Sequence, residues 1–333
     1  MVISRTPFRI SFFGGGTDYP DWYKRNPGAV LAASIDKYCY ITCGYLQPFF
    51  DCKHRIFYSK HEMVKNINDI QHPTARETLR FMRVRRGISI QHVADLPARS
   101  GMGSSSSFTV GLLNALYALK GKMVSKKQLA LEAIEIEQNW AKENIGSQDQ
   151  VTAAFGGFNK IEFKPGKNNI EVRPVTLYSK KIRFFQSHLM LFFTGMSRLA
   201  SEIAGEQIEN IPKKNKELKL IYEMVNQALN ILNTKTTFEA FGKLLHESWK
   251  LKRSLSNKIT NPIIDDIYEA GMRGGALGGK ILGAGGGGFI LFFVKPELQP
   301  RVREKLKKIL YVPFKFEELG SQIIYYRPDF FAP

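Results

Sequence analysis

Residues 97–108 read PARSGMGSSSSF and place two glycines and five serines between two regular patterns. The preceding run, ISIQHVADLP at 88–97, alternates enough apolar residues to predict a strand. The following run, FTVGLLNALYAL at 108–119, spaces its large apolar residues for one helix face. The serines therefore fall at a helix N-terminus, where unpaired backbone N–H groups and the helix dipole favour a bound anion.

Two further glycine clusters, FFGGGTDY at 12–19 and GAGGGG at 283–288, accompany this segment. An isolated Gly/Ser stretch is more often a linker or a helix cap. This one runs directly into an apolar-periodic helix, however, and three glycine loops are more than turns usually require. We therefore predict a phosphate-binding loop and a phosphoryl-transfer site, the loop consisting of Ser100, Gly101, Met102, Gly103, Ser104, Ser105 and Ser106.

Size and composition favour a globular protein of two domains. The 333 residues are 44% hydrophobic and carry 48 basic against 30 acidic side chains, a net charge of +18. That charge suits nucleic acid, an anionic membrane or a polyanionic substrate, but the basic residues are scattered and partly on helical patterns. RNP, KH and helix-turn-helix patterns are absent, which makes a nucleic-acid-binding module the weaker alternative. Without a membrane-length apolar run or a signal-peptide pattern, we expect a cytoplasmic location and no membrane partner.

Three cysteines and a histidine, Cys39, Cys43, Cys52 and His54, resemble a zinc ligand set. The first two lie in IDKYCYITCGY, which predicts one strand, so they would be roughly 13 Å apart. Sulfurs bound to one zinc are only about 4 Å apart. We therefore expect reduced, mostly buried thiols rather than a metal site.

The pattern along the chain predicts an α+β protein with domains at 1–178 and 179–333, separated by the polar segment 165–181. Ser125 is expected to cap a helix whose core face includes Ile136 and Trp140. Asn261 and Pro262 are expected to begin another helix, and a basic amphipathic helix is expected over 296–310.

Two segments match familiar nucleotide-binding motifs, but the residues around them do not fit the structures that these motifs require. GAGGGG satisfies G-x-G-x-x-G, but it precedes the strand-like FILFFV instead of following a strand and opening a helix. GGALGGKI at 274–281 satisfies G-x-x-x-x-G-K, but Ile281 stands where a hydroxyl must bind magnesium. Lys280 is left open as either a phosphate contact or a solvated lysine.

Taken together, the three loops resemble the GHMP family of small-molecule kinases. The matching segments are RTPFRISFFGGGTDY at 5–19, LPARSGMGSSSS at 96–107 and LGAGGGG at 282–288, so that the resemblance covers nearly the whole chain. It implies a two-domain fold, with the phosphate loop in the N-terminal domain and a ferredoxin-like α+β C-terminal domain. It also implies an enzyme that uses ATP and Mg²⁺ to phosphorylate a small molecule.

Within the family, the segments are most similar to kinases of a sugar phosphate. The expected reaction transfers the γ-phosphoryl group to the anomeric hydroxyl of D-glycero-D-manno-heptose 7-phosphate, for GDP-heptose biosynthesis. Galactokinases have Glu-His where this chain has Gly15 and Gly16, which argues against galactose. A kinase of a free sugar such as fucose and a non-catalytic nucleotide sensor remain as alternatives, and the oligomeric state stays open.

The resemblance also assigns catalytic and metal-binding roles. Asp149 in GSQDQ matches the carboxylate that accepts the proton of the substrate hydroxyl, and Arg9 matches the basic residue beside it. Glu137 matches the glutamate that holds magnesium, with Ser105 or its neighbour Ser104 completing the metal shell. From the residues alone, Glu137 could equally lie on a solvated helix face.

A third group of residues is expected to contact the sugar. Asp18 matches an aspartate that binds sugar hydroxyls, although an Asp after glycines is often only a turn residue. A phosphate at the far end of the sugar would need basic partners, for which Lys252, Arg253 and Arg273 are candidates besides Arg198. The expected substrate contacts are Asp18, Gly15, Gly16, Thr17, Arg198, Gly285 and Gly286.

Overall fold

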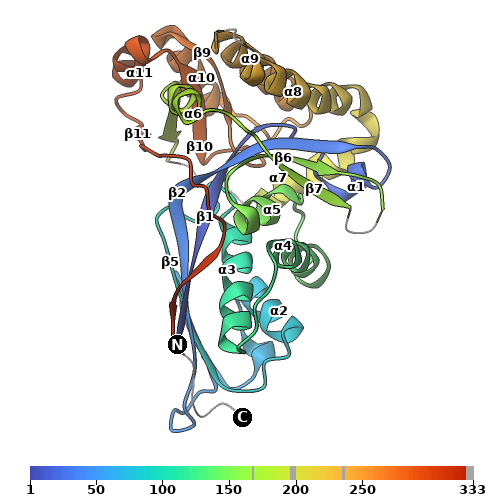
Figure 1. Cartoon of the computed structure of the whole chain (residues 1–333), viewed down its shortest axis with the longest axis vertical. Helices are drawn as coiled ribbons and strands as arrows, with labels where there is room; N and C mark the ends of the chain where they lie inside the picture. Colours follow the sequence, from blue (N-terminus) through green and yellow to red (C-terminus); the bar gives the residue numbers. More distant parts are fainter. Residues whose placement is uncertain (167–168, 196–199, 235–236, 328–333) are drawn as a thin grey trace.

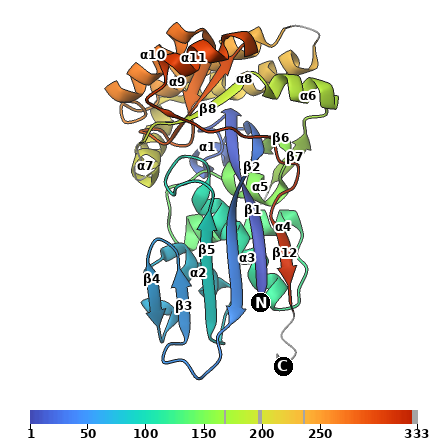
Figure 2. The same ribbon diagram turned by 90° about the vertical axis from the view of Figure 1, so that its left-hand side faces the viewer.

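The computed structural model describes residues 1–166, 169–195, 200–234 and 237–327. The structure has two sheets of mostly antiparallel strands, with helices on their faces. The smaller sheet and its helices lie at one end of the larger sheet (Figure 1, Figure 2). This mixed arrangement of strands and helices is the α+β fold that the sequence predicts.

The larger sheet has the order β12-β1-β2-β5-β3-β4, and β6 and β7 extend it beside β2. The 18-residue strand β2 pairs with β1 along its length, while its first part pairs with β6 and its last part with β5. Helices α2, α3, α4 and α5 lie on one face of this sheet (Figure 1). Its strands are β1 Val2–Phe13, β2 Gly28–Tyr45, β3 His54–Phe57, β4 His61–Val64, β5 Ile88–Ala94, β6 Phe158–Phe163, β7 Ile170–Pro174 and β12 Gln322–Tyr326.

Helix starts in the first half follow local sequence signals. The Ser125 hydroxyl accepts the N–H of Gln128 and caps α4, as expected. Gly103 takes a left-handed conformation, with φ of +78°, immediately before α3. The helices of this half are α1 Pro20–Tyr23, α2 Pro73–Phe81, α3 Ser104–Leu119, α4 Lys126–Glu135 with the π-helical turn η2 Ile136–Trp140, and α5 Gln148–Phe155, with a 3-10 turn η1 at Ile67–Asp69.

The smaller sheet is antiparallel, with the order β11-β8-β10-β9. None of the described helices is long and apolar enough to cross a membrane. The strands are β8 Leu189–Phe193, β9 Ala276–Ile281, β10 Phe289–Val294 and β11 Leu310–Tyr311. The helices are α6 Ser179–Gln186, α7 Ala200–Asn210, α8 Asn215–Asn233, α9 Glu239–Arg253, α10 Pro262–Gly274 and α11 Gln299–Lys305, with 3-10 turns η3 Ile211–Lys213 and η4 Pro296–Leu298.

The glycines of GGALGGKI serve close packing. Gly278 and Gly279 lie on β9, whereas Gly274 and Gly275 end α10. A Cβ on Gly278 would come within 2.1 Å of the Gly242 carbonyl oxygen of α9. Only glycine allows the helix to approach the strand this closely. The segment is therefore a strand under a helix, in agreement with the rejection of a Walker loop.

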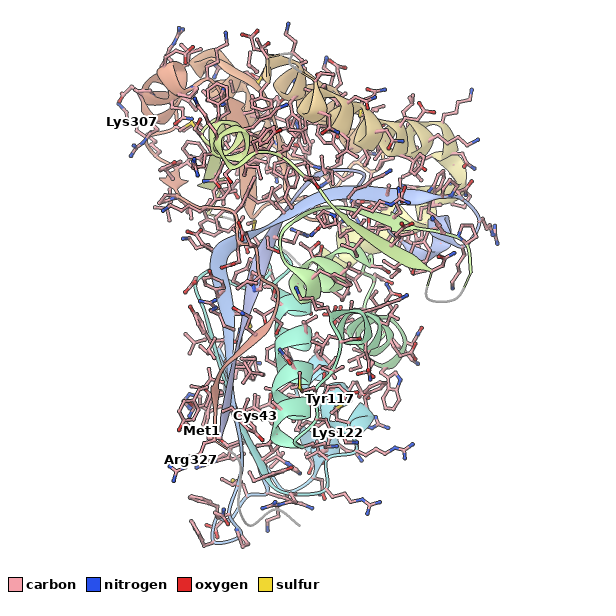
Figure 3. All side chains as sticks on the ribbon, viewed as in Figure 1. Met1, Cys43, Tyr117, Lys122, Lys307 and Arg327 are labelled. Atoms are coloured by element: carbon pink, nitrogen blue, oxygen red, sulfur yellow. The ribbon has the colours of Figure 1, made fainter. Side chains whose placement is uncertain are left out.

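The C-terminal segment returns to the first sheet. Strand β12 pairs antiparallel with β1, and the Met1 amino group donates to the Arg327 carbonyl oxygen at 2.9 Å. Figure 3 shows Met1, Arg327 and Cys43 together at this end of the sheet. The division at residues 178 and 179 stays a prediction, and the structure adds that the strand near the chain's end belongs with the first half.

The two halves share one aromatic core. Phe12 of β1 is fully buried and makes ring contacts at centroid distances of 5.5 to 6.3 Å with Phe158, Phe185, Phe241 and Phe316. Its partners come from a strand of the first sheet, from two helices of the second half and from the segment leading back to β12. This cluster fixes how the second half sits on the first.

Several expectations about helices need correction. Trp140 is 40% exposed instead of facing the core, because the helix widens into the π-helical turn η2 and the face of the last residues shifts. The helix expected over 296–310 ends at Lys305, and Leu310 begins β11. Helix α2 was not expected, since its nine residues include few large apolar side chains and its buried face includes Thr74, Glu77 and Thr78.

The cysteines behave as expected for reduced thiols. Cys39 and Cys43 are buried on β2, and Cys52 is partly buried. Burial raises the pKa of Cys43 to about 12, so that it is a poor metal ligand. Across the described ranges, no group of three His, Cys, Asp or Glu side chains could hold a metal ion.

The shared core predicts a large cost for Phe12→Ala. Loss of a buried ring with four aromatic neighbours should lower the free energy of unfolding by about 3–5 kcal/mol in urea denaturation. The matched control is Phe49→Ala, because Phe49 is 78% exposed and its loss should cost within about 0.5 kcal/mol. A similar small effect for both variants would contradict the role given to Phe12.

Candidate active site

A cavity of about 870 Å³ opens where the two halves meet. Its walls come from β1 and the turn after it, the loop before α3, the start of α5, the end of α9, strand β9 and the loop after β9. Many of the lining residues belong to the segments that the sequence analysis identified, and most of these are polar residues or glycines. The lining includes Arg9, Gly15, Gly16, Asp18, Gly101, Gly103, Ser104, Ser105, Ser106, Gly146, Asp149, Lys252, Lys280 and Gly283.

The start of α3 forms one wall of this cavity. The first helical hydrogen bond runs from the Ser107 N–H to the Gly103 carbonyl oxygen at 2.9 Å, which leaves the preceding N–H groups directed out of the helix end. Gly101 and Gly103 line the cavity together with Ser104, Ser105 and Ser106. This geometry suits an anion such as a polyphosphate.

Two residues of the expected phosphate loop lie behind the wall of the cavity. Ser100 and Met102 are fully buried and do not line the cavity. The Ser100 carbonyl oxygen accepts the N–H of Phe289 at 3.2 Å, and that of Met102 accepts the N–H of Arg9 at 3.2 Å. They hold the loop to the neighbouring strands through backbone bonds, so direct anion contact is left to the other five residues.

Glu137 lies under the serines of α3. Its Oε1 accepts from Ser105 Oγ at 2.7 Å and Thr109 Oγ1 at 3.0 Å. Its Oε2 accepts from Ser106 Oγ at 2.8 Å and from Gln150 Nε2. Burial raises the pKa of Glu137, while these four hydrogen bonds act against the rise. The interpretation as a solvated helix face is wrong for Glu137, whose side chain is fully buried.

Of the two expected magnesium ligands, Ser105 lines the cavity, whereas the fully buried Glu137 carboxylate lies behind it and does not. The Ser105 hydroxyl faces the cavity and lies 2.7 Å from a carboxylate oxygen, and both are the hard oxygen ligands that Mg²⁺ prefers. Magnesium keeps several waters and takes further oxygens from phosphates, so that one carboxylate and one hydroxyl are enough protein ligands. Ser104 lines the cavity as well, but of these two candidate serines it is Ser105 that donates to Glu137.

Arg9 and Asp149 form a bidentate ion pair in the middle of the site. Arg9 Nε donates to Asp149 Oδ1 at 2.7 Å and Nη2 donates to Oδ2 at 2.8 Å, while Nη1 donates to the Gly101 carbonyl oxygen at 2.6 Å. The Arg9 and Asp149 side chains are only 4% and 14% exposed. A Cβ on Gly103 would lie 3.3 Å from Asp149 Oδ2, so the loop places its backbone directly against this carboxylate.

Asp18 lies beside this pair and is buried. Its carboxylate accepts the N–H of Gly16 at 2.9 Å and the N–H of Gln148 at 3.3 Å, joining the glycine turn to the start of α5. Burial raises the pKa of Asp18, the Gly16 hydrogen bond opposes this, and the negative charge of Asp149 adds to the rise. Asp18 therefore does more than stabilise a local turn, because its carboxylate links the glycine turn to the start of α5.

The other expected sugar contacts divide into two groups. Gly15 and Gly16 line the cavity, whereas Thr17 is fully buried, with its hydroxyl 2.8 Å from the Gly14 carbonyl oxygen. Gly285 and Gly286 pack against Ile259 outside the cavity, because the loop turns away after residue 284. Direct sugar contact is therefore not supported by the positions of Thr17, Gly285 and Gly286. Arg198 lies outside the described residues.

Of the three described basic residues expected to bind a distal phosphate, only one lines the cavity. Arg253 and Arg273 pair with Asp265 and Glu269 near the surface and do not line the cavity. Lys252 lines it and is buried. Burial is what distinguishes the three, and the sequence alone does not report it.

Sequence reasoning missed several lining residues. Ser11 is two positions after Arg9 on β1, so the alternation of a strand would have placed both on one face. Gln148 and Gln207 carry no local signal. Two further lining residues, His72 and Phe108, stack their rings at 4.6 Å, and burial lowers the pKa of His72 to about 4.

The Glu137 network predicts a stability cost for Glu137→Ala. The donors of Ser106, Thr109 and Gln150 would lose a buried acceptor, which should reduce the free energy of unfolding by about 1–3 kcal/mol in denaturant titrations without ligand. Glu135→Ala is the matched control, since Glu135 is exposed two positions earlier. An unchanged or higher stability of Glu137→Ala would contradict the assigned network.

Comparison with known proteins gives consistent matches. The model of the GHMP kinases N terminal domain matches residues 68–157, and that of the GHMP kinases C terminal matches residues 215–312. A D-glycero-alpha-D-manno-heptose 7-phosphate kinase of Campylobacter jejuni is 28% identical over 318 residues, covering 92% of this chain and 93% of its own. A bifunctional fucokinase/GDP-fucose pyrophosphorylase of Arabidopsis thaliana is 23% identical, over 91% of this chain and 31% of its own.

Solved structures show the same fold. The crystal structure of a D-glycero-D-manno-heptose 1-phosphate kinase from Bacteriodes thetaiotaomicron superposes with a TM-score of 0.77, at 23% identity, and covers 98% of this chain and 100% of its own. A mevalonate kinase superposes with a TM-score of 0.71, at 21% identity, over 96% of this chain and 100% of its own. The two-domain arrangement expected from the three glycine loops is thereby confirmed.

Proposed function

Because the chain belongs to the GHMP kinases and is an ATP-dependent sugar kinase of that family, we propose that its acceptor is the anomeric hydroxyl of D-glycero-D-manno-heptose 7-phosphate. The products are the 1,7-bisphosphate and ADP, in a step toward nucleotide-activated heptose. The observation that carries the proposal is the Asp149 carboxylate, which Arg9 holds beside the phosphate loop at the wall of a sugar-sized cavity.

In this proposal the start of α3 binds the polyphosphate of ATP. The outward N–H groups of Ser104, Ser105 and Ser106 donate to phosphate oxygens and the helix dipole adds a partial positive charge. Magnesium, held by Glu137 and Ser105, would neutralise charge on the phosphates. Phosphoryl transfer mainly needs alignment and charge neutralisation, so we expect direct in-line transfer without a phosphoenzyme.

Asp149 acts as the general base in this scheme. Its carboxylate accepts the proton of the anomeric hydroxyl while that oxygen bonds to the γ-phosphorus and the bond to the bridging oxygen of ADP breaks. Arg9 keeps the carboxylate oriented through two hydrogen bonds and brings positive charge close to the transferred group. Asp18 accepts hydrogen bonds from sugar hydroxyls at the neighbouring wall.

The glycine turn supports a sugar larger than galactose. A Cβ on Gly15 would meet nothing closer than Gln148 Nε2 at 3.6 Å, so the space beside this residue is open. A side chain at this position, as galactokinases have, would occupy this space, whereas a Cβ on Gly16 would lie 3.2 Å from Leu218. The similarity to the Campylobacter heptose 7-phosphate kinase over most of both chains points in the same direction. The fucokinase matches keep a free sugar as the second candidate.

A panel of acceptors tests the substrate. In a coupled assay of ADP release at equal concentrations, heptose 7-phosphate should give the highest kcat/KM, ahead of fucose, galactose and heptose without its phosphate. The physical reason is that a phosphate offers charged hydrogen bonds that a hydroxyl cannot match. Preferential turnover of fucose would replace the proposed substrate by the second candidate.

Asp149→Asn tests the base. Removing the proton acceptor while keeping the shape of the side chain should lower kcat by roughly 100-fold or more. Steady-state kinetics should show little change in the KM for ATP, since Asp149 lies on the acceptor side of the phosphate loop. Asp266→Asn serves as control because Asp266 is exposed on α10. An unchanged kcat in Asp149→Asn would remove the base assignment.

A further inference from the structure

Two lysines line the cavity without a role in the scheme above. Lys252 lies in the last turn of α9 and Lys280 lies on β9, and both side chains reach the cavity that contains Asp18 and Asp149. They are only 8% and 4% exposed. Lysines are almost never this buried unless they have a partner.

The two ammonium groups lack a carboxylate partner among the residues that the structure describes. Lys280 Nζ donates to the Phe12 carbonyl oxygen at 2.9 Å. Lys252 Nζ donates to the Ile281 carbonyl oxygen at 3.2 Å and to that of Gly283. No ion pair within 4.0 Å joins either lysine to a described acidic side chain, although Asp18 lies near enough to influence both lysines and Asp149 near enough to influence Lys252.

Their charge is costly without a ligand. Burial lowers the pKa of Lys252 to about 7 and lowers the pKa of Lys280 well below its usual value, with Arg9 adding to both effects. Asp18 opposes this fall for both lysines, but its carboxylate already accepts two backbone N–H groups. Asp149 opposes it for Lys252, but its carboxylate is already engaged by Arg9. A bound anion would supply the missing negative charge.

The hydrogen-bond inventory matches a phosphate. An ammonium has three N–H donors, of which Lys280 uses one and Lys252 uses two on backbone carbonyls, leaving two and one. These three donors equal in number the terminal oxygens of a phosphate monoester. Their position is on the acceptor side, since Phe12 comes just before the glycine turn that carries Gly15 and Gly16.

Two unpartnered polar atoms mark the same wall. Ser11 Oγ and Gln148 Oε1 are buried without a hydrogen-bond partner, and both residues line the cavity. A Cβ on Gly15 would lie within 4 Å of both side chains, so they border the open space beside the glycine turn. Buried polar atoms without partners indicate a polar ligand at this position.

We propose that Lys252 and Lys280 form a subsite for the phosphate that the sugar acceptor already carries, and that they thereby select phosphorylated over free sugars. This inference rests on the proposed function for the identity of the sugar. The phosphate loop has its own donors for the nucleotide, so the lysines add recognition at the other substrate. They are specificity-determining residues, distinct from the base Asp149.

The first experiment compares acceptors in lysine variants. Lys280→Met and Lys252→Met should lower kcat/KM for heptose 7-phosphate by about 10- to 100-fold, the loss expected for a hydrogen bond to a charged group. Turnover of heptose without its phosphate and the KM for ATP should stay unchanged. Lys280→Gln keeps a donor for the Phe12 carbonyl while removing the charge, and should show the same selective loss if Lys280→Met folds poorly.

Lys250→Met is the matched control, because Lys250 lies on the same helix with an exposed side chain that pairs with Glu247. Its acceptor preference should equal that of the unaltered protein. Equal losses on both acceptors in the Lys252 and Lys280 variants, or a raised KM for ATP, would overturn the inference. Those results would assign the lysines to the transferred phosphoryl group or to the fold.

A second experiment separates this inference from the proposed function. Inorganic phosphate is titrated calorimetrically into the protein saturated with Mg²⁺ and a nonhydrolysable ATP analogue, so that the phosphate loop is filled. The unaltered protein and Lys250→Met should bind phosphate, whereas Lys252→Met and Lys280→Met should bind at least about 10-fold more weakly. If heptose 7-phosphate is not an acceptor but this difference is found, the function fails and the subsite stands. Equal binding by all four proteins would overturn the subsite whatever the acceptor is.

Discussion

The ion pair between Arg9 and Asp149 is the interaction on which the rest of the site depends. Its three hydrogen bonds join β1, the start of α5 and the Gly101 carbonyl oxygen of the phosphate loop. A buried pair offsets the cost of desolvation only when its geometry is good and its remaining donors are satisfied. The geometry is bidentate here and three of the five N–H donors of Arg9 are used, so that a single arginine fixes a carboxylate and an anion-binding loop relative to each other.

Close backbone approach is the second constraint, and it explains why three glycine loops occur in one sequence. A Cβ on Gly283 would come within 2.5 Å of the Gly101 Cα, so the loop after β9 touches the loop before α3 directly. Gly283 also accepts a hydrogen bond from Lys252 through its carbonyl oxygen. The second half of the chain thus contributes both a wall and positive charge to a site whose carboxylates come from the first half. The local balance of these buried charges, more than the overall +18, defines the kind of ligand that the cavity favours.

Much of the fold follows from local patterns. The strand and helix around the phosphate loop and the Ser125 and Asn261 caps lie where periodicity and capping rules predict them. The misses have physical causes. Trp140 faces outward because a π-helical turn shifts the helix face, and no rule of 3.6 residues per turn anticipates that. Strand β12 pairs with β1 across almost the whole chain, which its own short sequence cannot specify.

For the site, the sequence by itself determined the loop type and, through a family resemblance, the identities of Arg9, Asp18, Glu137 and Asp149, because these residues stand in or near recognisable segments. Only the tertiary structure decided which side chains meet. It buried Glu137 under the serines, placed Thr17 and the later glycines outside the cavity, and brought Lys280 to a carbonyl 268 positions earlier in the chain. The physical reason is range: propensity and spacing report on neighbours within a few residues, whereas burial and charge in a cavity depend on elements that pack together from distant parts of the chain.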